Sequence, residues 1–235
     1  MSEQNSSLSE RRSFLTRISA GMTAFAATLV GGAAVAQAQA PAAGHFQPTR
    51  HEKDDWLDQF PGKHRMVFDT TSSDSLGDAL AFANNFMRTN RSDYNLQNSD
   101  LAVLIIMRHR STTLGYNDKM WEKYGKYLSA RAEFVDPKTK EPPKSNIFNS
   151  TEYDRQLPNR GNTIDSLLKQ GVQLGICSVA TRGAATAIAE ATSQKADDVF
   201  NELAANLISP QARLVPAGIV AVGRAQERGY SLVTT

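Results

Sequence analysis

Cysteine is almost absent from this sequence: Cys177 is the one cysteine among 235 residues. A single thiol per chain excludes an intramolecular disulfide framework and a Cys-x-x-Cys redox pair. A strong excess of charge is lacking as well, because 26 Lys and Arg residues are balanced by 24 Asp and Glu residues, for a formal net charge of +2. The chain therefore lacks the basic character that is typical of nucleic-acid-binding proteins, and no nucleic-acid partner is expected.

The sequence also lacks the signature motifs of several large enzyme classes. No Gly-x-Gly-x-x-Gly follows an apolar strand, and no phosphate-binding loop of the Gly-x-x-x-x-Gly-Lys type is present. The Gly-x-Ser-x-Gly elbow of serine hydrolases is missing too. His45 and His51 lie near acidic residues, but their spacing fits no standard zinc site. These absences argue against a dinucleotide-dependent enzyme and a serine hydrolase, and no cofactor is expected.

Residues 1–38 are expected to be an export signal that is cleaved after Ala38. The segment from Glu10 to Thr16 (ERRSFLT) resembles a twin-arginine signal, although its two end residues depart from the usual Ser and Lys. The run from Ile18 to Ala36 is weakly apolar, and Ala36-Gln37-Ala38 matches the A-x-A cleavage pattern. A transmembrane helix is the alternative, but glycines interrupt the run and no basic stop follows it. The resemblance implies a periplasmic protein that is exported by the twin-arginine route, with no membrane span after cleavage.

Residues 39–62 are rich in Ala, Pro, Gly and charged residues, and this composition predicts a linker. A short amphipathic piece is expected within it, around Trp56, Leu57 and Phe60. The folded domain is expected to span residues 63–235, which is long enough for one sizeable hydrophobic core.

Within residues 63–235, apolar runs of strand length alternate with segments of helical periodicity. The run from Asp100 to Met107 (DLAVLIIM) is typical of a parallel strand that is buried on both faces. The segment from Ser75 to Thr89 places apolar residues three or four positions apart, which predicts an amphipathic helix. The alternation predicts a doubly wound α/β domain with a parallel sheet. The expected strands are 64–69, 100–107, 172–176, 214–216 and 230–233, and the expected helices are 75–89, 117–128, 163–169, 183–192, 195–207 and 217–228.

One long segment, residues 134–162, interrupts this alternation. Four prolines (137, 142, 143 and 158) and scattered polar residues leave it without a periodic apolar face. It is predicted to be a surface insertion. A loop of this length is a functional lid, a partner-binding arm or a disordered segment, and the sequence leaves these alternatives open.

The single cysteine occupies a position at which reactive groups gather in α/β proteins. The stretch from Gly171 to Arg182 (GVQLGICSVATR) reads as an apolar strand that ends on Cys177, followed by a polar turn and an alanine-rich helix. Ligands bind at the carboxyl ends of such strands, and the amides and dipole of a following helix favour a thiolate. The alternative is that Cys177 is simply a small buried apolar residue.

Two segments resemble the DsrE/DsrF-like family. The first is VPAGIVAVGRAQERGYSLV, from Val215 to Val233, and the second is GVQLGICSVATRG, from Gly171 to Gly183. The resemblance extends from about residue 64 to residue 233, and the 134–162 insertion is an addition to it. It implies a flavodoxin-like three-layer α/β domain with a mostly parallel five-stranded sheet. It also implies assembly into a homo-oligomer, a trimer or a hexamer.

The resemblance further implies that Cys177 carries sulfur as a persulfide. Thr181 as a hydroxyl donor and Arg182 as a fixed cation are candidate supports for the charge on that sulfur. His109 also falls at a strand end and is a third candidate, although a surface turn histidine is the alternative for it. A carrier of this kind would need a sulfur donor or acceptor as its partner, either a protein or a small thiol.

Three functional hypotheses follow from the sequence. The first is an exported sulfur carrier or sulfurtransferase-like protein that acts through Cys177. The second is a non-catalytic module that binds a small molecule, haem or a metal, with Cys177 or His109 as a ligand. The third is a structural subunit of an oligomer, in which the insertion serves as an assembly arm.

Overall fold

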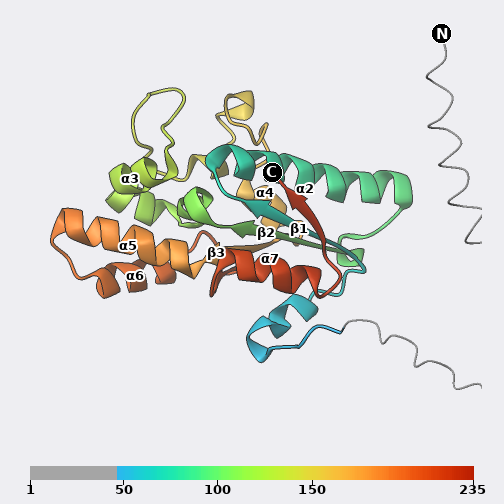
Figure 1. Ribbon diagram of the computed structural model, residues 1–235. Coiled ribbons are helices and arrows are strands. Elements are labelled where there is room, and N and C mark those ends of the chain that lie inside the picture. Colours follow the sequence, from blue (N-terminus) through green and yellow to red (C-terminus); the bar gives the residue numbers. More distant parts are fainter. Residues whose placement is uncertain (1–46) are drawn as a thin grey trace, which may run out of the picture. The chain divides into compact units, whose positions relative to one another are not determined.

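Five parallel strands form the sheet at the centre of the domain (Figure 1). The structure is a computed structural model that describes residues 47–235, and the export signal expected at 1–38 lies outside the described residues. The strand order is β4-β3-β2-β1-β5, and every neighbouring pair is parallel. The predicted α/β class with a flavodoxin-like arrangement is therefore confirmed, with a sheet that is parallel throughout. The strands are β1 (His64–Thr70), β2 (Leu101–Met107), β3 (Gln173–Cys177), β4 (Ala212–Val215) and β5 (Ser231–Thr234).

Helices cover both faces of this sheet, and the direction of the chain explains which helix covers which face. From β1 to β4 the chain moves one way across the sheet, and the helices between these strands pack in one apolar cluster on one face. From β4 to β5 it moves the opposite way, so a right-handed crossover places α7 on the other face. No helix in the described part of the chain is both long and apolar enough to cross a membrane. The helices are α2 (Ser73–Tyr94), α3 (Asp118–Ala132), α4 (Ile164–Leu168), α5 (Ser178–Thr192), α6 (Ala196–Ala205) and α7 (Gly218–Gln226).

The central strand β2 is buried along its whole length. Its side chains alternate between the two apolar clusters: Val103 and Ile105 belong to one, and Leu104 and Ile106 belong to the other. A strand that packs against helices on both faces needs apolar residues at successive positions, which is why this run does not alternate with polar residues.

Helix α5 begins earlier than its sequence predicts. The expected start was Gly183, after a polar turn, but the helix starts at Ser178, directly after the strand. Cys177 itself is the N-cap, and its sulfur accepts a hydrogen bond from the backbone N–H of Ala180. The hydroxyl of Thr181 donates to the backbone oxygen of Cys177. The polar residues of the expected turn therefore serve as the first turn of the helix.

Residues 48–62, which their composition assigns to a linker, pack onto the domain in the structure. They contain the 3-10 helix η1 (Glu52–Asp58), in which Trp56 and Leu57 are buried. The hydroxyl of Tyr230 donates to the backbone oxygen of Leu57 at 3.0 Å. The side chain of Arg228 is fully buried and donates to Asp58 at 3.1 Å. This segment thus covers part of the sheet face that carries α7.

The insertion at 134–162 is folded against the rest of the domain. Ile147 and Phe148 are buried and belong to the larger apolar cluster. The amide of Asn146 donates to the backbone oxygens of Leu114 and Tyr116, at 2.7 and 2.9 Å. Tertiary contacts therefore stabilise the conformation of the insertion, although its sequence has no periodic apolar face.

A buried pair of side chains holds the insertion internally. The hydroxyl of Tyr153 donates to Asp136 at 2.5 Å. Burial alone would raise the pKa of Asp136, but the hydrogen bonds from Tyr153 and from the backbone N–H groups of Lys138 and Thr139 outweigh it and lower that pKa. Burial, together with the bond to Asp136, raises the pKa of Tyr153 to about 12.

Candidate functional site

The candidate site lies where the helices that follow two neighbouring strands go to opposite faces of the sheet. Strands β3 and β4 are neighbours, and Cys177 pairs with Val215 at their carboxyl ends. Helix α5 follows β3 on one face, whereas α7 follows β4 on the other. In open α/β sheets this divergence creates a crevice beyond the strand ends, and ligands bind there. Cys177 therefore occupies the topological switch point of the sheet.

The sulfur of Cys177 accepts two backbone hydrogen bonds from two different helices. The N–H of Gly218, at the start of α7, lies 3.2 Å from it, and the N–H of Ala180, in the first turn of α5, lies 3.4 Å from it. The first amides of a helix have no partner within the helix and carry its positive partial charge. Two such termini therefore place positive partial charge beside one sulfur.

Gly218 is a glycine because its neighbours leave no room for a side chain. A Cβ at this position would lie 2.5 Å from the Cβ of Arg108, and 3.2 Å from both the Cδ of Arg108 and the Cγ2 of Ile106. The start of α7 can approach the end of β2 this closely only without a Cβ. That approach is what brings the Gly218 amide within hydrogen-bonding distance of the thiol.

Arg108, which the sequence alone did not mark as a site residue, lies next to Gly218. It follows β2 and binds Asp69 of β1 in a two-point pair, with Nε–Oδ1 at 2.7 Å and Nη2–Oδ2 at 2.8 Å. The hydrogen bond to Asp69 raises the pKa of Arg108 above its ordinary value; burial opposes this shift, and electrostatic interactions with Asp69 and Cys177 add to it. Arg108 therefore packs its side-chain carbons beside Gly218, while Asp69 holds its guanidinium at the end of β1.

A signal for this pair exists in the sequence. Asp69, Arg108 and Cys177 lie at or next to the ends of three successive strands, and parallel strands bring such ends to one edge of the sheet. Asp69 and Thr70 belong to β1, and neither caps the helix that follows it. The structure gives that role to Ser72, which forms a capping box with Ser75.

Thr181 lies next to Cys177 but bonds to its backbone and not to its sulfur. Its hydroxyl donates to the backbone oxygen of Cys177 at 2.9 Å and accepts from the hydroxyl of Tyr116 at 2.9 Å. Burial raises the pKa of Tyr116 well above its ordinary value, although the bond to Thr181 opposes the shift. Thr181 therefore holds the start of α5 in place beneath the thiol.

Arg182 is directed away from the thiol. Its guanidinium lies 2.5 Å from a carboxylate oxygen of Asp197 and 3.7 Å from the ring centre of Phe200, both on α6. These contacts join α5 to α6. Arg182 therefore does not supply the fixed cation expected beside the thiol.

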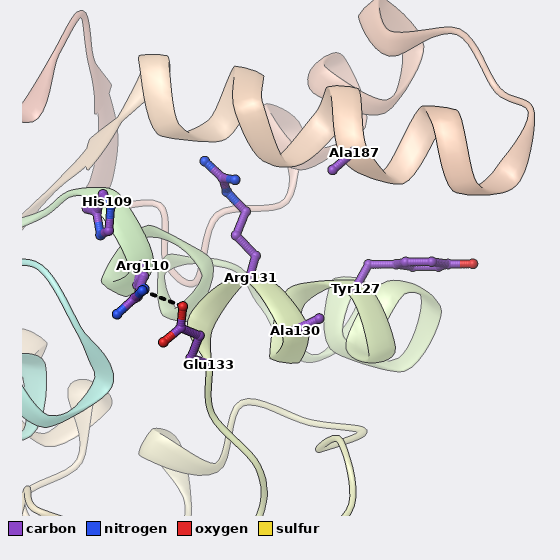
Figure 2. A pocket seen from close by; sticks show the side chains of 7 residues that line it. All are labelled: His109, Arg110, Tyr127, Ala130, Arg131, Glu133 and Ala187. Carbon is purple, nitrogen blue, oxygen red and sulfur yellow. Dashed lines mark ion pairs between the residues drawn. The ribbon is translucent and has the colours of Figure 1, made fainter.

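His109 lines a separate pocket together with residues of α3 and α5 (Figure 2). It is exposed, begins the 3-10 helix η3 (His109–Gly115) and has a left-handed backbone, with φ of 57°. Cys177 is not among the residues that line this pocket. The sequence therefore located His109 at the correct end of the sheet, but the structure does not bring it to the sulfur.

The thiol is buried, and exposed apolar side chains lie in the first turns of the two helices whose amides contact it. Cys177 is 6% exposed. Val179 follows it in the first turn of α5, and Ile219 and Val220 follow Gly218 in the first turn of α7; all three are exposed. Three exposed apolar side chains therefore lie within two residues of Ala180 and Gly218, whose amides contact the sulfur.

Metal binding finds no support in the described residues. Between residues 47 and 235, no group of three or more His, Cys, Asp and Glu side chains is arranged to hold a metal ion.

Comparison of the chain with protein-family models, with curated proteins and with solved structures found no match. The fold and the geometry around Cys177 are therefore the grounds on which a function can be inferred.

Proposed function

We propose that this protein is a DsrE/DsrF-like sulfur carrier that holds a sulfur atom as a persulfide on Cys177. The observation that supports this proposal is the sulfur itself, which accepts the backbone N–H groups of Gly218 and Ala180 at the switch point of the sheet. A carrier needs a nucleophilic thiolate and donors that stabilise the negative charge on it. A cysteine that served only to fill space would need neither helix terminus.

Loading of the carrier is a thiol exchange in which atoms and electrons balance. The Cys177 thiol first loses its proton to solvent. Its thiolate then attacks the outer sulfur of a donor persulfide, R–S–S–H, and a new S–S bond forms on Cys177 as the donor S–S bond breaks. The electron pair of the broken bond leaves with the donor as R–S⁻. Release is the same exchange in reverse, with an acceptor thiolate as the attacking group.

The surrounding residues would assist this exchange by holding negative charge. The amides of Gly218 and Ala180 stabilise the thiolate before attack, and Arg108 adds a positive charge that its pair with Asp69 keeps in position. Thr181 keeps the backbone of Cys177 in the orientation that directs the sulfur between the two helices. Because these groups are fixed by the fold, little reorganisation is needed during transfer.

The proposal extends to the place and the partners of the protein. It would work in the periplasm after twin-arginine export, as a homo-oligomer of three or six chains, and exchange sulfur with a donor or acceptor protein or a small thiol. The exposed apolar residues Val179, Ile219 and Val220 support the protein-partner alternative, since they are sequence neighbours of Ala180 and Gly218, whose amides contact the thiol. Turnover with an acceptor thiol would make the protein a sulfurtransferase-like enzyme.

Intact-mass measurement after incubation with glutathione persulfide tests the proposal. We expect the mass of one added sulfur atom per chain, its loss on treatment with a reducing thiol, and no gain in Cys177→Ser. A second sample, denatured before exposure to the donor, controls for access to the thiol. If the folded protein gains no sulfur while the denatured chain does, Cys177 is a packing residue and the carrier proposal fails.

A further inference from the structure

A surface pocket lies between α3 and α5 (Figure 2). Its volume is about 440 Å³, which falls within the range of about 300–1,000 Å³ that is typical of small-molecule sites. None of the residues that hold the Cys177 sulfur belongs to its lining, so the two sites are separate. The lining residues are His109, Arg110, Tyr127, Ala130, Arg131, Glu133 and Ala187.

The pocket carries a positive charge that is not neutralised within the domain. Arg110 forms an ion pair with Glu133, shown as a dashed line in Figure 2. In contrast, no carboxylate among residues 47–235 lies within ion-pair distance of Arg131. Two guanidinium groups and one carboxylate leave the lining positive even when His109 is neutral. An anion is therefore the ligand that this lining favours.

Arg131 is exposed, and its guanidinium lies close to α5. Figure 2 shows its side chain extending from α3 toward the neighbouring helix. A Cβ on Gly183 of α5 would lie 2.7 Å from the Nη2 atom of Arg131 and 3.4 Å from its Cζ atom. Glycine is unfavourable inside a helix, and here its lack of a side chain leaves the space that the guanidinium uses.

Two residues of the lining have a backbone conformation that side chains disfavour. His109 and Glu133 have φ of 57° and 51°, in the left-handed region. At Glu133, the residue after the last turn of α3, glycine is the usual choice. Strained residues of this kind persist where the surrounding structure holds them, and they cluster at functional sites. Both side chains line the pocket.

The remaining lining is apolar and lies at the other end of the pocket. Figure 2 shows Tyr127 and Ala187 on the side opposite His109, with Ala130 between the ends. Tyr127 is half-buried and brings an aromatic side chain to this end of the lining. The pocket therefore combines a positive end with an apolar, partly aromatic end.

We propose that this pocket binds a small aromatic carboxylate. Its carboxylate pairs with Arg131, and its ring lies against Tyr127 and the two alanines. Arginine binds carboxylates through two parallel hydrogen bonds, and aromatic rings pack on one another. This binding function goes beyond sulfur transfer and does not depend on it.

Titration of the full-length protein with benzoate tests the proposal, followed by amide chemical shifts and by calorimetry. We expect saturable binding, with the largest shifts in α3 and α5 around Tyr127 and Ala187. Acetate carries the charge without the ring, and benzyl alcohol carries the ring without the charge; both should bind at least about fivefold more weakly than benzoate. Equal binding of either compound, or no saturation with benzoate, overturns the proposal.

A pair of matched variants locates the site. Arg131→Gln should weaken benzoate binding about tenfold, because hydrogen bonds between charged groups are among the stronger ones. Arg88→Gln removes an exposed arginine of α2 that likewise has no ion-pair partner in the described chain, and should leave binding unchanged. Cys177→Ser should also bind normally, which separates this test from the test of the sulfur carrier. Equal affinity of Arg131→Gln and the wild-type protein overturns the assignment.

Discussion

The backbone N–H of Gly218 donates a hydrogen bond to the Cys177 sulfur at 3.2 Å, across 41 positions of the chain. The contact exists because β3 and β4 are neighbours whose helices leave on opposite faces of the sheet. The two helix N-termini then meet at the strand ends, and the sulfur lies between them. A glycine that the sequence presents as part of a helix start thus becomes part of a thiol site.

The substitution Gly218→Ala should damage the thiol site more than it damages the helix. The new Cβ would lie 2.5 Å from the Cβ of Arg108, and relief of such overpacking costs about 1–3 kcal/mol of folding free energy. The start of α7 must move, so the sulfur loses a donor. We expect slower alkylation of the folded protein by iodoacetamide and a lower persulfide yield than in the wild type.

Gly223→Ala is the matched control for this substitution, since both glycines lie in α7. A Cβ at Gly223 would have no heavy atom within 4 Å, and alanine in a helix interior is about 0.5–1 kcal/mol more favourable than glycine. Thiol reactivity should therefore stay at the wild-type level and stability should rise slightly. Equal effects of the two substitutions on alkylation would show that the Gly218 contact does not matter for the sulfur.

The substitution Arg108→Gln tests the cation beside the thiol. It leaves the carboxylate of Asp69 with 6% of its side chain exposed and without its two-point partner, a loss that should cost about 2–3 kcal/mol of folding free energy. It also removes a positive charge that interacts with the thiolate. We expect a lower alkylation rate of Cys177, measured at a temperature where the variant is fully folded.

Arg108→Lys keeps the charge and loses the two-point geometry, so it separates the two effects. It should recover much of the alkylation rate but only part of the stability. A rate as low as that of the glutamine variant would mean that the geometry of the pair matters for the thiol and its charge does not.

The pair formed by Tyr153 and Asp136 should make stability depend on pH at both extremes. The pKa of Asp136 is lowered in the folded protein, so its contribution is present above the ordinary value of 3.8 and is lost as the pH falls below it. The pKa of Tyr153 is raised from 10.0 to about 12, so its contribution is present below pH 10 and is lost between pH 10 and about pH 12. Tyr153→Phe should lose about 1 kcal/mol at neutral pH and flatten both dependences.

Urea denaturation at several pH values measures this effect. Tyr94→Phe is the control, because Tyr94 is 69% exposed and its hydroxyl can remain in water. The control should retain the stability and the pH profile of the wild type. If Tyr153→Phe also retains them, the bond to Asp136 does not hold the insertion.

The segment that contains η1 should contribute to the stability of the domain. Trp56 is 7% exposed, its ring packs edge-on against Phe60 at 5.9 Å, and the guanidinium of Arg213 lies 4.6 Å from its ring centre. Trp56→Ala should therefore cost about 3 kcal/mol, as is usual for truncation of a buried aromatic residue. Denaturation with urea measures the loss, and limited proteolysis should show earlier cleavage within residues 48–62. An unchanged midpoint would support the linker interpretation instead.

The elements of the fold were accessible from local patterns. The unbroken apolar run of β2 predicted a strand buried on both faces, and the apolar spacing of α2 and α3 predicted helices that cover a sheet. These patterns depend on residues within a few positions of one another, so they can be read along the chain. The packing of residues 48–62 and of the insertion could not, because most of their partners, such as Tyr230 for Leu57 and Leu114 for Asn146, are distant in the sequence.

Some features of the candidate site could likewise be predicted from the local sequence, whereas others depend on tertiary packing. The residue order alone predicts that Cys177 ends a strand and precedes a helix. It therefore also predicts that the first amides of α5 lie near the sulfur. The residue order does not show where the two nearby arginines go: Arg182 binds Asp197 on α6, whereas Arg108, at the end of the neighbouring strand, binds Asp69. The second amide at the sulfur depends on the reversal of direction after β4, which places the start of α7 on the opposite face. Local periodicity predicts the helices and strands, but the packing of these elements determines which residues a side chain contacts.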